Sequence, residues 1–195
     1  MATVGFFGSR DLPQAWYPSI TAAVAAFAGA GRTIATGCAV GADAVSLAAA
    51  LQLAGPARVT VYTAFDRFGR GAWRMSNVDG VRAADLAGAD VHWLAGGSLL
   101  FPLVTRLRMR SRAMVAGVTP AQLTDRHSGI VGWITALPPR SPGSWATVRF
   151  AAHCGLRVVL FNVGWAMRLA PLLGPGRWVS AGGGIWTNAC LWQPD

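Results

Sequence analysis

The stretch from residue 33 to residue 51, TIATGCAVGADAVSLAAAL, most constrains how this chain can fold. The short apolar run Thr33 to Thr36 predicts a buried strand, and the Ala-rich run that opens near Gly41 predicts a helix. Two glycines, Gly37 and Gly41, are typical of the tight turn between them. Such a turn leaves backbone N–H groups free at the helix N-terminus, where the helix dipole favours an anion such as phosphate.

Similar hydrophobic runs recur along the chain and alternate with helix-like segments. Strands are predicted at residues 3–7, 33–36, 58–64, 91–94, 129–135 and 157–163, and helices at 20–27, 41–51, 77–86, 102–118 and 144–152. This alternation predicts an α/β fold with an open, mainly parallel sheet that is covered by helices on both faces. We expect residues 1–164 to form this domain.

The segment from residue 165 to residue 195 has a different composition, because tryptophans stand among glycines and prolines. We expect this C-terminal extension to form a short helix and then a hairpin near residues 178–191. The hairpin would pack on the edge of the sheet or on a neighbouring subunit. A contact between subunits would give a homodimer or a larger assembly.

The charged residues limit the possible chemistry, because all 17 basic residues are Arg and all eight acidic residues are Asp. No Glu can act as a general base, and no Lys can form a Schiff base or bind phosphate. The net charge of +9 indicates an anionic partner such as a nucleotide, a nucleic acid or an acidic protein. A solvated Arg-rich surface is the alternative.

The cysteines and histidines do not have the spacing of metal ligands. Cys38, Cys154 and Cys190 form no CxxC pair, so we expect reduced structural thiols, no metal and no cofactor. No apolar run reaches the roughly 18 residues of a membrane span, and no basic segment precedes the first apolar stretch. We therefore expect a cytoplasmic protein that does not associate with membranes.

Three short stretches follow predicted parallel strands, and their ends should meet at one edge of the sheet. They are Gly8-Ser9-Arg10, residues 37–43 and residues 141–147. In the last, SPGSWAT, one hydroxyl could cap the helix and others could donate to phosphate oxygens. Arg10 supplies a fixed guanidinium fork. Capping alone would explain each stretch by itself, but their convergence favours a phosphate site.

The predicted helix at 102–118 carries four arginines at two-residue spacing: Arg106, Arg108, Arg110 and Arg112. At about 100° per residue, the first and third flank one side of the apolar face, and the second and fourth flank the other side. One pair could therefore reach a ligand while the other stays in solvent, and Arg112 is the best basic candidate.

These motifs resemble those of the SLOG superfamily of Rossmann-like domains, above all the DNA-processing protein A (DprA/Smf) group. FGSR at residues 7–10 is similar to the GSR turn of that group. TGCAVGADAVSLAAAL at 36–51 follows its SGxARGIDxxAHxxAL pattern, and PGSWATVRFAAHCGLRVV at 142–159 follows SGSxxTAxxAxxxGRxV. MRSRAMV at 109–115 resembles an Arg-rich helix start of the superfamily. The resemblance covers residues 3–164 and implies a Rossmann-like fold.

The resemblance also guides the expected activity. Val40, Leu47 and Pro142 differ from the DprA pattern. The more distant Lonely Guy (LOG) proteins carry PGGxGTxxE and remove ribose phosphate from nucleotides, but Phe150 stands at the position of their Glu. We therefore expect a nucleotide-binding domain that does not catalyse breakdown of its ligand, and we assign no catalytic residue. The expected ligand-binding residues are Gly8, Ser9, Arg10, Gly37, Gly41, Asp43, Arg112, Gly143, Ser144 and Thr147.

Two alternatives from other classes stay open. The first is single-stranded DNA binding of the DprA type, with Arg67, Arg70 and Arg74 on the phosphate backbone. The second is a structural or assembly subunit that keeps the fold as a scaffold. Asp43 itself could hold a ribose hydroxyl or cap its helix.

Overall fold

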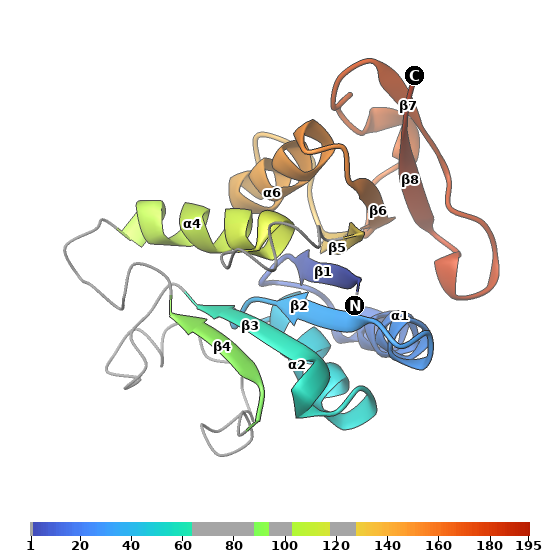
Figure 1. The fold of residues 1–195 in the computed structure, drawn as a ribbon. Coiled ribbons are helices and arrows are strands. Elements are labelled where there is room, and N and C mark those ends of the chain that lie inside the picture. Colours follow the sequence, from blue (N-terminus) through green and yellow to red (C-terminus); the bar gives the residue numbers. More distant parts are fainter. Residues whose placement is uncertain (1, 64–87, 94–102, 118–127) are drawn as a thin grey trace.

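The computed structural model describes residues 2–63, 88–93, 103–117 and 128–195. These residues form one eight-stranded sheet with the strand order β4-β3-β2-β1-β5-β6-β8-β7 (Figure 1). All neighbours from β4 to β6 are parallel, and β8 and β7 are antiparallel additions. The strands are β1 Thr3–Gly8, β2 Thr33–Thr36, β3 Val59–Thr63, β4 Asp90–Trp93, β5 Gly129–Ile134, β6 Arg157–Asn162, β7 Gly176–Ser180 and β8 Ala189–Pro194.

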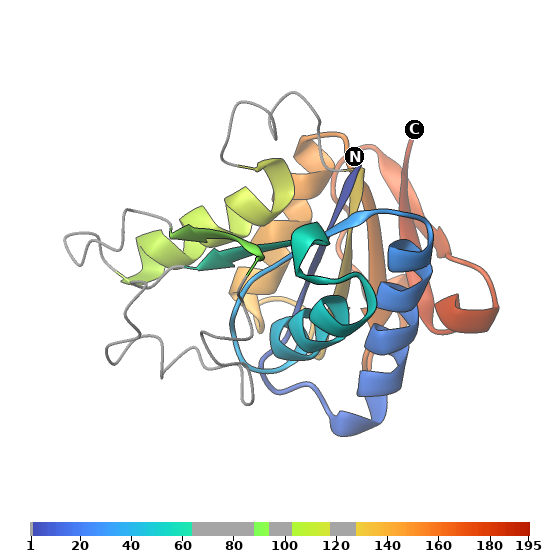
Figure 2. The ribbon, with the colours of Figure 1, turned by 60° about the horizontal axis from the view of Figure 1, so that its bottom comes forward.

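Helices cover both faces of the sheet (Figures 1 and 2). One face carries α1 (Tyr17–Gly29) and α2 (Ala42–Leu53), and the other carries α4 (Leu103–Ala116) and α6 (Pro142–His153). The central strands are buried on both sides, as a parallel sheet between two helical layers requires. The predicted α/β fold, a mainly parallel sheet with helices on both faces, is confirmed.

An aromatic stack on the α1 face anchors the two central strands. The Trp133 ring of β5 stacks on Phe161 of β6 with centroids 4.7 Å apart, and on Phe6 of β1 at 6.1 Å. Trp133 Nε1 also donates a hydrogen bond to Ser19 Oγ of α1. On the opposite face a Cβ at Gly132 would meet the Phe7 ring, so glycine lets these strands pack tightly there. The stack therefore ties β1, β5 and β6 together on this face.

The C-terminal segment continues the same sheet. After a 3₁₀ turn (Met167–Leu169), β8 pairs antiparallel with β6, and β7 pairs with β8 at the edge. Trp165 Nε1 donates to the backbone oxygen of Ile134 at 2.6 Å, and Trp192 is buried against Trp178. Tryptophans thus attach this segment to the domain through both packing and hydrogen bonds. The expected contact with a second subunit stays a prediction.

Most predicted elements match observed elements to within about two residues at the strands, and helix ends differ by a few residues. The predicted helix at 77–86 lies outside the described residues, as do Arg67, Arg70 and Arg74. Within the described part of the chain, no helix is both long and apolar enough to cross a bilayer.

Candidate functional site

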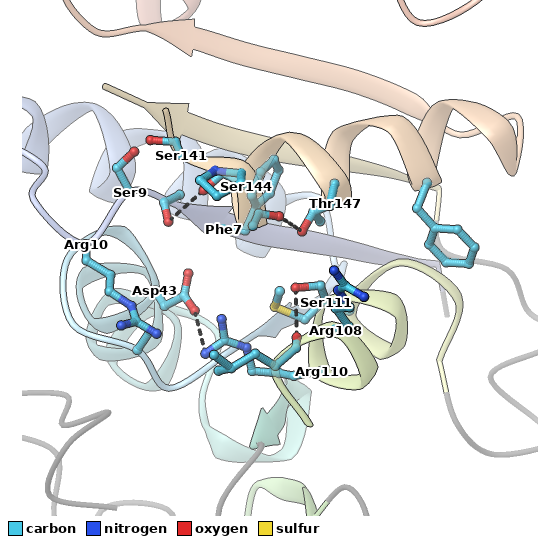
Figure 3. A pocket seen from close by; sticks show the side chains of 18 of the residues that line it. Phe7, Ser9, Arg10, Asp43, Arg108, Arg110, Ser111, Ser141, Ser144 and Thr147 are labelled. Carbon is cyan, nitrogen blue, oxygen red and sulfur yellow. Dashed lines mark hydrogen bonds and ion pairs between the residues drawn. The ribbon is translucent and has the colours of Figure 1, made fainter. Parts of the chain in front are cut away.

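The sheet changes its winding direction at β1, which lies between β2 and β5. In open α/β sheets ligands bind beyond the carboxyl ends of the strands at such a switch point. Here a pocket of about 790 Å³ lies at that edge, between the end of β1 and the helices α4 and α6 (Figure 3). The expected residues that line it are Gly8, Ser9, Arg10, Asp43, Arg112, Gly143, Ser144 and Thr147.

Gly37 and Gly41 do not line the pocket, and each has a packing reason to be glycine. A Cβ at Gly37 would overlap the Asp43 carboxylate. Gly41 has φ +82°, and a Cβ there would meet the backbone oxygens of Ser9 and Arg10. This close approach lets the first amide of α2, at Ala42, donate a hydrogen bond to Ser9 O at 3.2 Å. A role of these two glycines in ligand binding stays a prediction.

The turn between β2 and α2, residues 37–43, is filled by the protein's own carboxylate; we call it the filled corner. Asp43 is 2% exposed and accepts backbone hydrogen bonds from Ala39 and Gly8. Its Oδ2 lies 3.9 Å from Arg110 Nη1, too far for a hydrogen bond (Figure 3). Burial raises the pKa of Asp43 above its ordinary 3.8, and the positive charge of Arg110 and the two amides oppose that shift only in part.

The capping alternative for Asp43 is wrong, because Gly41 is the N-cap and no side chain caps α2. Asp43 instead lies inside the first turn and reaches back across the corner toward β1. The expected contact of its carboxylate with a ribose hydroxyl stays a prediction.

The turn between β5 and α6, residues 135–144, is the open corner. Ser141 is the N-cap of α6 in the left-handed region, with φ 52° and ψ 47°, and Pro142 follows it. The amides of Gly143 and Ser144 donate to no acceptor within the described ranges. A Cβ built on Gly143 meets nothing within 4 Å. Gly143 and Ser144 both line the pocket, and their N–H groups lie at the positive end of the helix dipole.

The expected hydroxyl cap of α6 is wrong, because no side chain makes a capping hydrogen bond there. An N-cap side chain reaches the first amides from an extended backbone, and Ser141 is left-handed instead. Ser144 Oγ donates to Gly8 O at 3.4 Å, and Thr147 Oγ1 donates to Gly143 O at 3.1 Å. Both hydroxyl protons therefore serve internal acceptors.

Arginines from α4 line the opposite wall (Figure 3). Arg108 and Arg112 lie on its exposed flank, and Arg110 also lines the pocket although its side chain is only 11% exposed. Arg106, the expected partner of Arg110, is buried at 7% exposure and does not line the pocket. The expectation that one pair reaches the site while the other stays in solvent is therefore wrong, because neither Arg106 nor Arg110 lies in solvent. Arg110 joins the other pair because it extends toward Asp43.

Sequence reasoning missed Arg108 and Arg110 as wall residues, and also the aromatic residues Phe7 and Phe150. Arg108 lies one helical turn before Arg112, so the spacing that selected Arg112 also pointed to it. Phe150 forms part of the wall at the position where LOG proteins have Glu, and Arg112 Cζ lies 5.4 Å from the centre of its ring.

Among the described residues, no three His, Cys or Asp side chains are close enough together to hold a metal ion. The cysteines are free, and burial raises the pKa of Cys190 to about 12, which keeps that thiol protonated at neutral pH.

Comparisons with known proteins are informative at the level of the structure. No family model matches the sequence, and no curated protein matches it. Among solved structures, the chain is similar to DNA-processing protein A from Helicobacter pylori, whose structure was described for its single-stranded DNA binding mode. The TM-score is 0.56 at 14% identity, and the match covers 80% of this chain.

This match shows a DprA-like, Rossmann-like fold, so the resemblance seen in the motifs is confirmed at the level of the fold. The aligned region spans 63% of the Helicobacter pylori protein. The more distant relation to LOG proteins stays a prediction.

Proposed function

We propose that the pocket binds a nucleotide or a nucleotide-derived phosphate ligand and does not catalyse its breakdown. The observation that carries this proposal is the open corner, where the Gly143 and Ser144 amides have no internal acceptor in the described part of the chain. The first turn of α6 contains no acidic residue that could occupy the place of a ligand. A phosphate there would accept both N–H groups and be favoured by the helix dipole.

The charges of the pocket wall support an anionic ligand. Arg10, Arg108 and Arg112 line the pocket and are exposed, so their guanidinium groups can reach a bound phosphate. The two acidic residues of the wall, Asp11 and Asp43, are engaged within the protein: Asp11 Oδ1 accepts a hydrogen bond from Thr135 Oγ1. The charge that faces a ligand is therefore mainly positive.

The size and chemistry of the pocket support binding without catalysis. A volume of about 790 Å³ lies within the usual range for small-molecule sites, roughly 300–1,000 Å³. A general base must reach the proton that it removes. Among the described lining residues only Asp11 and Asp43 carry a carboxylate; Asp11 Oδ1 accepts a hydrogen bond from Thr135, and Asp43 is 2% exposed.

Calorimetric titration with nucleoside 5′-monophosphates and diphosphates at low salt tests this proposal. Arg10→Ala should weaken binding about tenfold or more, because it removes a charge-assisted hydrogen bond to phosphate. Arg177→Ala is the matched control, since it removes the same charge from exposed β7, away from the pocket. Absence of binding to the wild type, or equal effects of the two substitutions, would refute the proposal.

The second candidate is single-stranded DNA binding, which the DNA-binding structural neighbour favours. The exposed Arg108 and Arg112 could contact successive phosphates of a strand that crosses the mouth of the pocket. The predicted backbone contacts at Arg67, Arg70 and Arg74 belong to this candidate.

Salt dependence and oligonucleotide length separate the two candidates. For single-stranded DNA, the logarithm of the affinity should fall with the logarithm of salt concentration, with a slope of about −0.7 for each phosphate neutralised. Fluorescence anisotropy with oligothymidylates of increasing length would show affinity that rises with length. A mononucleotide ligand predicts instead that the longer oligonucleotides bind no more tightly than the monophosphate.

A further inference from the structure

The pocket has a second end with different chemistry from the open corner. The pocket is lined by a stripe of residues along one side of α6: Gly143, Ala146, Thr147 and Phe150. Their spacing places them on the same face of the helix. Phe150 lies two turns beyond the open amides, about 10 Å along the helix axis. This distance is comparable to the length of a nucleotide from its phosphate, through the pentose, to the first ring of the base.

Phe150 does not form part of the main packing surface of α6. Trp145, Val148 and Ala151 are fully buried and attach the helix to the sheet, whereas Phe150 is half-buried in the pocket wall. Its neighbours along the wall include the apolar side chains of Leu107 and Met114 from α4. The ring thus packs against the edge of the core on one side and lines the pocket on the other.

Arg112 stacks against this ring, with its Cζ 5.4 Å from the ring centre. No ion pair joins Arg112 to a carboxylate within the described ranges, and both acidic wall residues are engaged elsewhere. The guanidinium is therefore positioned by an aromatic face and remains exposed. Guanidinium planes and aromatic rings are both surfaces on which nucleobases stack.

We propose that Arg112 and Phe150 form a base-stacking platform, so that the pocket selects a base-bearing nucleotide over free phosphate or a sugar phosphate. This inference rests on the proposed function, because the phosphate at the open corner places the base over the platform. The phosphate end would supply charge attraction, and the platform would supply the discrimination.

The test compares a nucleoside 5′-monophosphate with ribose 5-phosphate, which has the same phosphate and sugar but no base. Calorimetry on the wild type should show about 5- to 150-fold tighter binding of the nucleotide, the range expected for stacking of one base. Phe150→Leu keeps an apolar side chain but removes the aromatic face. It should abolish most of this ratio and leave the affinity for ribose 5-phosphate within about twofold.

Two further variants separate stacking from folding and from charge. Phe150→Tyr keeps the aromatic face and should retain the ratio. Arg112→Lys keeps the charge but loses the planar group. It should therefore lower the ratio of nucleotide affinity to ribose 5-phosphate affinity by a larger factor than it weakens the binding of ribose 5-phosphate.

Each outcome decides between the proposals. Equal binding of the two ligands to the wild type, or a full ratio in Phe150→Leu, overturns the platform and leaves the phosphate site standing. Binding of neither ligand overturns the proposed function and the platform with it. If both bind but Arg10→Ala weakens neither, the phosphate site fails, and the platform that rests on it is overturned as well.

Discussion

The filled corner between β2 and α2 and the open corner between β5 and α6 occupy equivalent places in the fold but have different contents. Each joins a parallel strand to the helix that follows it, at the same edge of the sheet. The first turn of α2 contains Asp43, whose carboxylate accepts amides of the corner, whereas the first turn of α6 has no acidic residue. The Asp43 carboxylate thus fills the space beside its own corner and accepts the amides of Ala39 and Gly8, whereas no acidic side chain stands at the start of α6. The second and third amides of each helix have no acceptor among the described residues.

The comparison also explains the different requirements for glycine. At the filled corner, Gly37 and Gly41 leave room for Asp43 and for the backbone of Ser9 and Arg10. At the open corner, a Cβ added at Gly143 would have no atom within 4 Å. Glycine in the first corner serves internal packing, and in the second it keeps the pocket floor clear.

The largest expected effect on stability comes from a methyl group added at the filled corner, and the same addition at the open corner is its control. Gly41→Ala should lower the free energy of unfolding by about 3 kcal/mol, because it combines a positive φ with a backbone clash. Gly143→Ala should change it by no more than about 0.5 kcal/mol. Urea denaturation of both variants checks this difference, and similar losses in the two would refute the contrast between the corners.

The internal carboxylate predicts a pH dependence of stability. The raised pKa of Asp43 means that the folded protein holds this proton more tightly than the unfolded chain, whose Asp has a pKa near 3.8. The contribution of Asp43 to stability is therefore greatest below pH 3.8 and falls as the pH rises from there through the raised pKa.

Asp43→Asn isolates this contribution, since it keeps the shape of the side chain and removes the titrating group. As the pH rises from 3.8 through the raised pKa of Asp43, the wild type should lose stability relative to Asp43→Asn. Denaturation at a series of pH values provides the measurement. Parallel curves for the two proteins would show that Asp43 does not carry a raised pKa.

The smallest expected effect concerns the left-handed residue of the open corner. Ser141→Gly should raise stability by about 0.5 kcal/mol, because relief of the unfavourable φ slightly exceeds the entropy cost of glycine. Ala30→Gly is the control: φ at Ala30 is −80°, so glycine relieves nothing and should destabilise. Thermal melting distinguishes these signs. A loss of stability in Ser141→Gly would mean that the serine side chain holds the corner.

Local elements could be predicted from the sequence with good accuracy. The strand at 33–36 is observed with the same bounds, and the helix predicted at 102–118 is observed as α4, Leu103–Ala116. These signals are local, since hydrophobic periodicity and glycine punctuation act within one element. The convergence of three corners was also predictable, because parallel strands end at one edge of a sheet.

The contents of the corners were not predictable in the same way. Both hydroxyl protons at the open corner serve backbone acceptors, and Arg110 reaches Asp43 from a helix that is distant in sequence. Four arginines at equal spacing look alike in the sequence, yet Arg106 is buried, Arg110 faces the filled corner and Arg112 covers Phe150. Each of these outcomes depends on a neighbour from another element.

The sequence by itself determined the alternation of strands and helices, the edge at which their ends meet and the excess of positive charge. Only the tertiary structure decided that the Ala39 and Gly8 amides donate to Asp43, while those of Gly143 and Ser144 have no acceptor among the described residues. The physical reason is that backbone preferences act over a few residues, whereas burial and hydrogen-bond satisfaction depend on side chains that the fold brings together from distant elements.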